Sequence, residues 1–453
     1  MNGHIKKISL AMMLAGATAL IAPSGFATEG YFTHGSGARN KAMGGAGVAD
    51  GRDATAAIIN PASMIGVGNE LTVSVSLFSP KRKFLGSGPA PSFTPSGIFE
   101  SSEKLFAIPN LAYVHQIDDT SAWSIGLSAN GGMNTNYRNV TNPTCQFLFS
   151  MTPPMAPADN GPYCGGTTGV NLSQALISAS YAKKFGNLSF SISPVFAFQI
   201  FEATGLQAFT FPGGPGQPAP TAFPTRMTNN GSDKSTGFGG KVGFQWEVSP
   251  EIRIGGTYQS KIGMSQFDKY AGLFADQGDF DIPSNYQIGI SADVSPNLTV
   301  SMDYRRINYT DVNSVSNPQI VIDASTGFPK QFGTTDGPGF GWTDVSVFKV
   351  GAEWRANDQW TLRAGFARNS QPVQGENITL NILAPGVVRS HFTAGGAFNM
   401  NEKHSFEFAV MYAPPESVSG IEITPQGPNP GHTISAKMNQ VEATFGWKMK
   451  FGG

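Results

Sequence analysis

Apolar and polar residues alternate with a period of two along most of this chain. In residues 69–84, for example, Leu71, Val73 and Val75 fall on one face, whereas Thr72 and Ser74 fall on the other. This alternation predicts β-strands with one apolar and one polar face. It recurs to the end of the chain and predicts fourteen strands within residues 69–453.

The connectors between the predicted strands alternate in length. The short ones are residues 117–121, 186–187, 249–251, 295–297, 356–359 and 401–403. The long ones are residues 85–104, 131–174, 204–237, 263–279, 310–345, 370–391 and 413–438. Six short turns on one rim and seven long loops on the other are typical of transmembrane β-barrels. We therefore predict an all-β fold, a fourteen-stranded antiparallel barrel that spans a membrane.

Aromatic residues near strand ends support the membrane assignment. Trp246, Tyr258, Trp354, Trp360 and Trp447 occupy such positions, as in the aromatic girdles of membrane barrels. The last predicted strand is apolar at every second position up to Phe451, which resembles the signal read by barrel-insertion machinery. Gly452-Gly453 after this phenylalanine departs from that signal.

Residues 28–68 lack the alternation and are rich in glycine and alanine. A barrel of eight strands is filled by its own side chains, whereas sixteen to eighteen strands leave an open channel. A fourteen-stranded lumen needs an inserted segment to close it. We therefore predict that residues 28–68 form a plug, or hatch, inside a barrel made by residues 69–453.

The first 27 residues predict a signal peptide. Lys6 and Lys7 precede an apolar run over residues 8–21, and Gly25-Phe26-Ala27 provides small residues before a cleavage site after Ala27. The alternative is a membrane anchor, but the apolar run is shorter than the roughly 20 residues that span a bilayer. Export of the chain follows from this interpretation.

Composition and motifs narrow the function. The net charge is −1, which argues against a nucleic-acid partner. The chain has no G-x-S-x-G or H-E-x-x-H motif, so we expect neither an enzyme nor a cofactor. Cys145 and Cys164 predict a disulfide in an oxidising compartment; the alternative, a metal site, lacks accompanying histidines.

The hatch segment carries a family resemblance. Gly44-Gly45-Ala46-Gly47-Val48-Ala49, Asp53-Ala54 and Asn60-Pro61-Ala62 resemble the hatch of the FadL/TodX/OmpP1 family of outer-membrane transporters for hydrophobic compounds. The resemblance implies a monomer in the outer membrane of a Gram-negative bacterium, in contact with membrane lipid and lipopolysaccharide. It implies passive uptake of long-chain fatty acids or, alternatively, aromatic hydrocarbons. A hydrophilic porin and an outer-membrane hydrolase are the rival hypotheses.

In this family, substrate rests in a groove of the outer loops, moves to a pocket beside the hatch N-terminus and exits laterally where the third strand is kinked. Apolar residues of the long connectors and the mature N-terminus are therefore candidate substrate-binding residues; the alternative is that they only pack against one another. They are Tyr31, Phe32, Phe209, Phe211, Phe223, Phe267, Leu273 and Phe274.

Three further sets of residues have candidate roles. Gly131-Gly132 resembles the site of the kink and is a candidate lateral gate, or else an ordinary pair of strand-end glycines. Asn60-Pro61-Ala62 is expected to set the hatch conformation. Cations on the predicted lumen face are candidate partners of a substrate carboxylate, unless they pair with the acidic residues of the same face or with the hatch. They are Lys241, Arg253, Arg305, Lys349 and Arg363.

Overall fold

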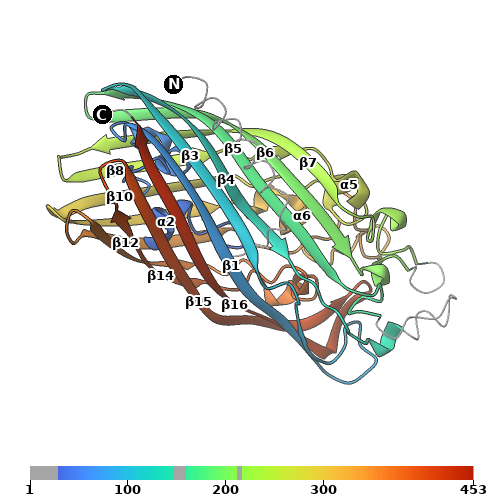
Figure 1. Ribbon diagram of the computed structural model, residues 1–453. Helices are drawn as coiled ribbons and strands as arrows, with labels where there is room; N and C mark the ends of the chain where they lie inside the picture. Colours follow the sequence, from blue (N-terminus) through green and yellow to red (C-terminus); the bar gives the residue numbers. More distant parts are fainter. Residues whose placement is uncertain (1–28, 146–159, 212–216, 452–453) are drawn as a thin grey trace, which may run out of the picture.

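The computed structural model describes residues 29–145, 160–211 and 217–451. The predicted signal peptide and Gly452-Gly453 lie outside these residues. A single antiparallel sheet of sixteen strands curls into a barrel (Figure 1). The sheet closes where β16 pairs with β1. Two of its strands are short additions at one rim, so fourteen form the barrel wall, as predicted.

The strands and helices have the following bounds. The wall strands are β1 (Asn69–Ser87), β3 (Phe106–Asp118), β4 (Ser121–Asn134), β5 (Gly169–Phe185), β6 (Leu188–Thr204), β7 (Asp233–Glu247), β8 (Ile252–Gln259), β10 (Asn285–Ser295), β11 (Leu298–Ile307), β12 (Val345–Arg355), β13 (Trp360–Asn369), β14 (Ser390–Asn399), β15 (His404–Thr424) and β16 (Gly427–Phe451). The short additions are β2 (Gly97–Glu100), beside β1, and β9 (Gly263–Met264), beside β7. The N-terminal segment contains α2 (Gly37–Ala42), α3 (Ala56–Ile59) and η1 (Pro61–Met64). The long connectors contain η2 (Gln207–Phe209), η3 (Pro224–Arg226), η4 (Asp268–Tyr270), α5 (Ala275–Gly278), η5 (Tyr309–Asp311), α6 (Asn313–Ser316), η6 (Gly375–Asn377) and η7 (Leu380–Ile382).

Six of the seven predicted long connectors join strands at one rim, and the six short turns lie at the other. The prediction of the seventh long connector, residues 413–438, was wrong. β15 and β16 continue through residues 413–438 as a long hairpin, and only Pro425-Gln426 separates them. The ladder shifts register between Ala413 and Glu416, where Pro414 and Pro415 lack amide donors. A bulge accommodates both prolines within the strand.

The apolar faces of the strands point outward. On β16, Phe445 is 57% exposed, whereas its neighbour Thr444 is 1% exposed and faces the lumen. A water-soluble barrel would bury the apolar face, so this arrangement requires an apolar solvent around the wall. Within the described residues, no helix has the length and apolar character needed to cross a membrane.

The N-terminal segment, residues 29–68, lies within the cylinder of strands (Figure 1). All six residues of α2 are buried. Wall residues approach the backbone of the segment closely: a Cβ on Gly365 of β13 would lie 2.2 Å from the carbonyl carbon of Met43. The close packing of segment against wall therefore requires glycines in the wall as well as in the segment, because a residue without a side chain lets the two backbones approach each other.

Buried ion pairs fasten this segment to the wall. Arg39 pairs with Asp50 of its own segment and with Glu353 of β12, at 2.8 Å. Glu353 also accepts from Arg363 of β13 at 2.7 Å. Lys41 pairs with Glu442 of β16. Since removing one partner leaves an uncompensated buried charge, these contacts hold the segment in place.

We predict that Glu353→Ala destabilises the protein, because it removes the buried carboxylate that Arg39 and Arg363 share and leaves each of them with one carboxylate partner, Asp50 and Glu407. The loss in the free energy of unfolding is expected to be about 3–5 kcal/mol. Urea unfolding in lipid vesicles, followed by tryptophan fluorescence, measures it. Glu402→Ala is the control, since Glu402 is exposed in the turn between β14 and β15 and forms no ion pair in the described residues. Equal stability of the two variants would contradict the prediction.

Candidate functional site

The start of the N-terminal segment lies beneath an aromatic cluster formed by the long connectors. The ring of Tyr31 packs against Phe280, Tyr309 and Trp342, with centroid distances of 6.0, 5.1 and 5.9 Å. The Tyr309 hydroxyl donates to the carbonyl of Glu29 at 2.6 Å and accepts from the amide of Tyr31 at 3.1 Å. These contacts join the segment to the rim that carries the long connectors.

Most of the candidate substrate-binding residues are buried rather than exposed. Phe267 and Phe274 pack on Phe201 with centroid distances of 5.5 and 4.6 Å, and Phe274 also contacts Phe280 at 4.8 Å. Tyr31, Phe32, Phe209 and Leu273 are buried as well. Phe211 and Phe223 are half-buried. In this structure the candidates therefore pack among themselves and their neighbours, and contact with substrate stays a prediction.

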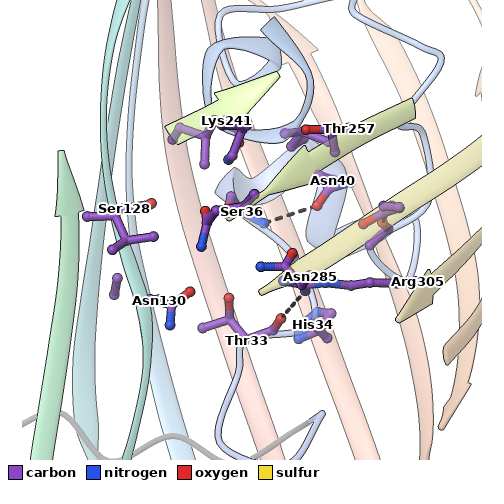
Figure 2. A pocket seen from close by; sticks show the side chains of 18 of the residues that line it. Thr33, His34, Ser36, Asn40, Ser128, Asn130, Lys241, Thr257, Asn285 and Arg305 are labelled. Atoms are coloured by element: carbon purple, nitrogen blue, oxygen red, sulfur yellow. Dashed lines mark hydrogen bonds between the residues drawn. The ribbon is translucent and has the colours of Figure 1, made fainter. Parts of the chain in front are cut away.

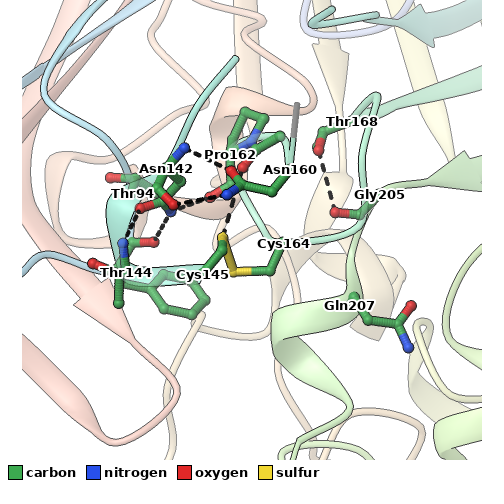
Figure 3. The surroundings of a disulfide bond; sticks show 12 residues. Thr94, Asn142, Thr144, Cys145, Asn160, Pro162, Cys164, Thr168, Gly205 and Gln207 are labelled. Atoms are coloured by element: carbon green, nitrogen blue, oxygen red, sulfur yellow. Dashed lines mark hydrogen bonds between the residues drawn. A yellow bond between two sulfur atoms is a disulfide. The ribbon is translucent and has the colours of Figure 1, made fainter. Parts of the chain in front are cut away.

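The disulfide between Cys145 and Cys164 organises the connector after β4 (Figure 3). Next to it, the Asn142 amide donates to the carbonyls of Phe93 and Pro162, at 2.8 and 2.9 Å. Tyr163 then packs on Phe209 with a centroid distance of 5.2 Å. The disulfide thus lies next to the aromatic contact between Tyr163 and Phe209.

The third wall strand, β4, is irregular at the predicted glycine pair. Its pairing with β3 ends at Ser128, opposite Asn110. Its pairing with β5 shifts register between Ala129 and Gly131. The N-terminal segment bonds to this stretch instead, because Thr33 donates its amide to Asn130 and Gly132 donates its amide to Tyr31, both at 3.0 Å. A Cβ on Gly131 would lie 1.9 Å from the Tyr31 carbonyl oxygen, so this approach requires glycine.

A polar cavity of about 80 Å³ lies between the N-terminal segment and the wall (Figure 2). Lys241, Arg305 and Lys349 line it together with His34. Arg305 and Lys349 both pair with Glu29, at 3.0 and 2.7 Å.

Four of the five candidate luminal cations have carboxylate partners. Besides Arg305 and Lys349, Arg253 pairs with Asp50 and Asp293, and Arg363 pairs with Glu353 and Glu407. Lys241 donates to the carbonyl of Ile58 at 2.7 Å. No carboxylate of the described residues lies within 4.0 Å of its ammonium group.

The sequence alone did not reveal two polar features of this site. Glu29, which neutralises two of the candidate cations, stood at the edge of a segment with no pattern. The imidazole rings of His34 and His391 stack at 6.1 Å with an interplanar angle of 7°, and none of their nitrogens has a hydrogen-bond partner among the described residues. These residues are 357 positions apart, so no sequence motif connects them.

The Asn60-Pro61-Ala62 tripeptide joins a helix cap to the wall. The Asn60 side chain accepts from the amide of Ala62 at 3.2 Å, which caps η1, and Pro61 occupies its first turn. The same side chain donates to the carbonyls of Val48 and Phe244, at 2.9 and 3.0 Å. One asparagine thus connects two turns of the segment with β7.

Two acidic residues, Asp279 and Asp281, lie next to the aromatic cluster in the connector before β10. Burial and the neighbouring Asp281 carboxyl raise the pKa of Asp279 to about 7. Lys261 pairs with Asp281 at 2.8 Å. These two aspartates flank Phe280, which contacts Tyr31.

We predict that Gly131→Val displaces residues 29–33, because the new side chain meets the Tyr31 carbonyl. The expected loss of stability is about 1–3 kcal/mol, as for other overpacked sites. Limited proteolysis at residues 29–36 should become faster. Gly240→Val is the control, since a Cβ there has no neighbour within 4 Å. Unchanged proteolysis of Gly131→Val would show that Tyr31 does not depend on this approach.

Comparisons with known proteins agree with the fold. A family model described as "Outer membrane protein transport protein (OMPP1/FadL/TodX)" matches residues 214–451. A long-chain fatty acid transport protein of Escherichia coli O157:H7 is 24% identical over 348 residues, which cover 69% of this chain and 71% of the relative.

Solved structures share the architecture at low identity. The toluene transporter TodX of P. putida superposes with a TM-score of 0.63 at 17% identity, covering 93% of this chain and 99% of TodX. The toluene transporter TbuX of Ralstonia pickettii gives a TM-score of 0.58 at 19% identity, covering 92% of this chain and 99% of TbuX. Because the family model matches more than half of the chain, this protein belongs to the outer membrane protein transport family (OMPP1/FadL/TodX) and resides in the outer membrane of a Gram-negative bacterium.

Proposed function

We propose that this protein takes up long-chain fatty acids passively across the outer membrane. In this proposal residues 1–27 are a signal peptide, residues 28–68 are the hatch and residues 69–453 form the barrel. The family transports hydrophobic compounds. An apolar solute crosses a polar cell surface poorly, so buried apolar surface offers it a favourable route, at about 25 cal/mol per Å².

The position of the Lys241 ammonium group is the observation that favours a fatty acid as the substrate. Its ammonium group borders the luminal cavity and lacks a carboxylate partner in the described part of the chain. A fatty-acid carboxylate would supply that partner through a charge-assisted hydrogen bond. Arg305 and Lys349 share Glu29 and are less available. A neutral aromatic hydrocarbon would gain nothing from the charge of Lys241.

The proposed route begins at the long connectors and ends in the membrane. Substrate would enter among the connector aromatics, of which Phe211 and Phe223 are partly accessible. It would pass Tyr31 and Phe32 and leave beside Gly131-Gly132, where β4 has lost its pairing with β3. This route leaves the buried ion pairs of the N-terminal segment intact.

Aromatic hydrocarbons are the second candidate substrate. The solved relatives TodX and TbuX are named toluene transporters, and the aromatic cluster around Phe201 and Phe274 would suit a ring-shaped substrate. A hydrophilic porin is disfavoured because the N-terminal segment occupies the lumen. Planar-bilayer recordings separate these hypotheses, since a porin would give a large, steady and non-selective conductance.

We predict that Lys241→Met lowers oleate uptake roughly tenfold at subsaturating oleate, the effect of losing one charged hydrogen bond. Toluene uptake should stay unchanged. Cells that express each variant and receive radiolabelled substrate provide the measurement.

Two control variants separate charge from structure. Lys241→Arg keeps the cation and should restore oleate uptake. Lys183→Met removes a half-buried lysine that pairs with Asp118 at the rim of short turns and should have no effect. If Lys241→Met lowers oleate and toluene uptake equally, the proposed carboxylate contact is wrong.

A further inference from the structure

A pocket of about 280 Å³ opens on the outside of the barrel, at the rim that carries the long connectors. We call it the rim basic pocket. Its charged lining residues are Lys81, Arg82, Lys83, Glu100, Lys104 and Lys437. It lies on the outer surface of β1 and β16, whereas the polar cavity of the uptake route lies inside the lumen.

The strand order explains the opening. β1 pairs with β3 only up to Phe78, opposite Phe106, and begins to pair with β2 at Lys83, opposite Glu100. Residues 79–82 of β1 have no strand partner on that side. On the other side, the bulge at residues 413–416 of β15 brings Pro415 to the pocket. Two irregularities therefore flank the lysines.

The register places these lysines at the edge of the apolar belt. Along β1 the outward residues Leu71, Val75 and Leu77 precede Lys81, which is ten positions after Leu71. Ten residues at about 3.3 Å each, in a strand tilted by about 40°, rise about 25 Å along the barrel axis. This rise equals the height of the apolar band of such barrels. Lys81 and Lys83 therefore lie where the outer leaflet meets its polar headgroups.

The residue pattern of β16 independently places the edge of the apolar belt at the same height. Its outward face is apolar from Phe451 back to Val441, and the next charged residue on that face is Lys437. Lys437 stands opposite Lys83 in the β1–β16 ladder. Lysines from both strands thus meet at one height.

The charges of the pocket are unbalanced. Glu100 is 3.6 Å from Lys104. Lys81, Lys83 and Lys437 have no carboxylate within 4.0 Å among the residues that the structure describes. Arg82 points inward, is 4% exposed and donates to the carbonyls of Asn134 and Glu103. Three ammonium groups therefore face the membrane boundary without an anion.

We propose that the rim basic pocket binds the phosphorylated sugar headgroup of an outer-leaflet glycolipid, the lipid A part of lipopolysaccharide. Phosphates attached to a membrane lipid sit at this height, and they supply the negative charge that the three lysines lack. The acyl chains would continue along the exposed apolar residues below the lysines. Leu77 and Val441 are 44% and 49% exposed there. Charge and apolar surface thus match the two halves of one lipid.

Native mass spectrometry of the purified full-length protein in detergent tests the proposal. The probes are diphosphorylated lipid A, dephosphorylated lipid A and inorganic phosphate. We expect one tightly held diphosphorylated lipid A per protein and binding at least tenfold weaker to dephosphorylated lipid A. The variant Lys81→Gln/Lys83→Gln/Lys437→Gln should bind diphosphorylated lipid A at least tenfold more weakly.

The control variant Lys183→Gln/Lys234→Gln/Lys269→Gln removes the same charge elsewhere, at one half-buried and two exposed lysines, and should bind as the unchanged protein does. Circular dichroism verifies that both variants keep the barrel. Three results would overturn the proposal: equal binding by both variants, equal binding of the two lipids, or tight binding of inorganic phosphate that lipid A does not displace.

Discussion

Buried ion pairs between the N-terminal segment and the barrel wall are the interaction on which the rest of this structure depends. Arg39, Glu353, Arg363 and Glu407 form a continuous chain from the segment across β12 and β13 to β15. Charges that are buried away from water persist only when they are paired. The wall therefore needs the segment as much as the segment needs the wall, and an empty lumen would leave several wall charges without partners.

This constraint shapes the proposed uptake route. A segment held by several buried ion pairs is costly to withdraw, so a path through the lumen that requires its removal is unfavourable. The bulge of β4 offers another path, since Gly131 faces the segment there and β3 has already separated from β4. The contacts that keep the lumen closed thus favour lateral exit. Lys241 lies outside the ion-pair network and donates to the carbonyl of Ile58, so the proposed contact with a substrate carboxylate would break no ion pair.

Local patterns predicted the fold because a barrel repeats one rule. Each wall strand presents alternate residues to lipid and to lumen, so the periodicity identified the strands and the connector lengths distinguished the two rims. The last hairpin was the exception, because residues 413–438 were predicted as a long connector but continue β15 and β16 through the bulge at Pro414-Pro415. Pairing with the distant β1 carries β16 back to Thr433, and pairing with β15 carries it on to Gly427.

The candidate site was less predictable because it depends on contacts across the barrel. Sequence placed Arg305 and Lys349 on the lumen face, but it did not show that Glu29 neutralises both. It indicated that the connectors are rich in aromatics, but not that Phe267 and Phe274 would bury each other around Phe201. It also gave no sign that His34 and His391 stack. Such pairings are set by the closed barrel, which local periodicity does not describe.

Tethering the N-terminal segment to the wall tests the central claim most directly. A Cβ on Gly446 of β16 would lie 3.3 Å from the Cβ of Ala38, close to the spacing of disulfides. Oleate uptake by Ala38→Cys/Gly446→Cys should therefore be measured in the oxidised and reduced forms, beside the unchanged protein in the same reductant, which also reduces Cys145–Cys164. The account predicts equal uptake by the oxidised double variant and the unchanged protein. Loss of uptake on oxidation, with recovery on reduction, would show that the segment must leave the wall and would contradict lateral exit.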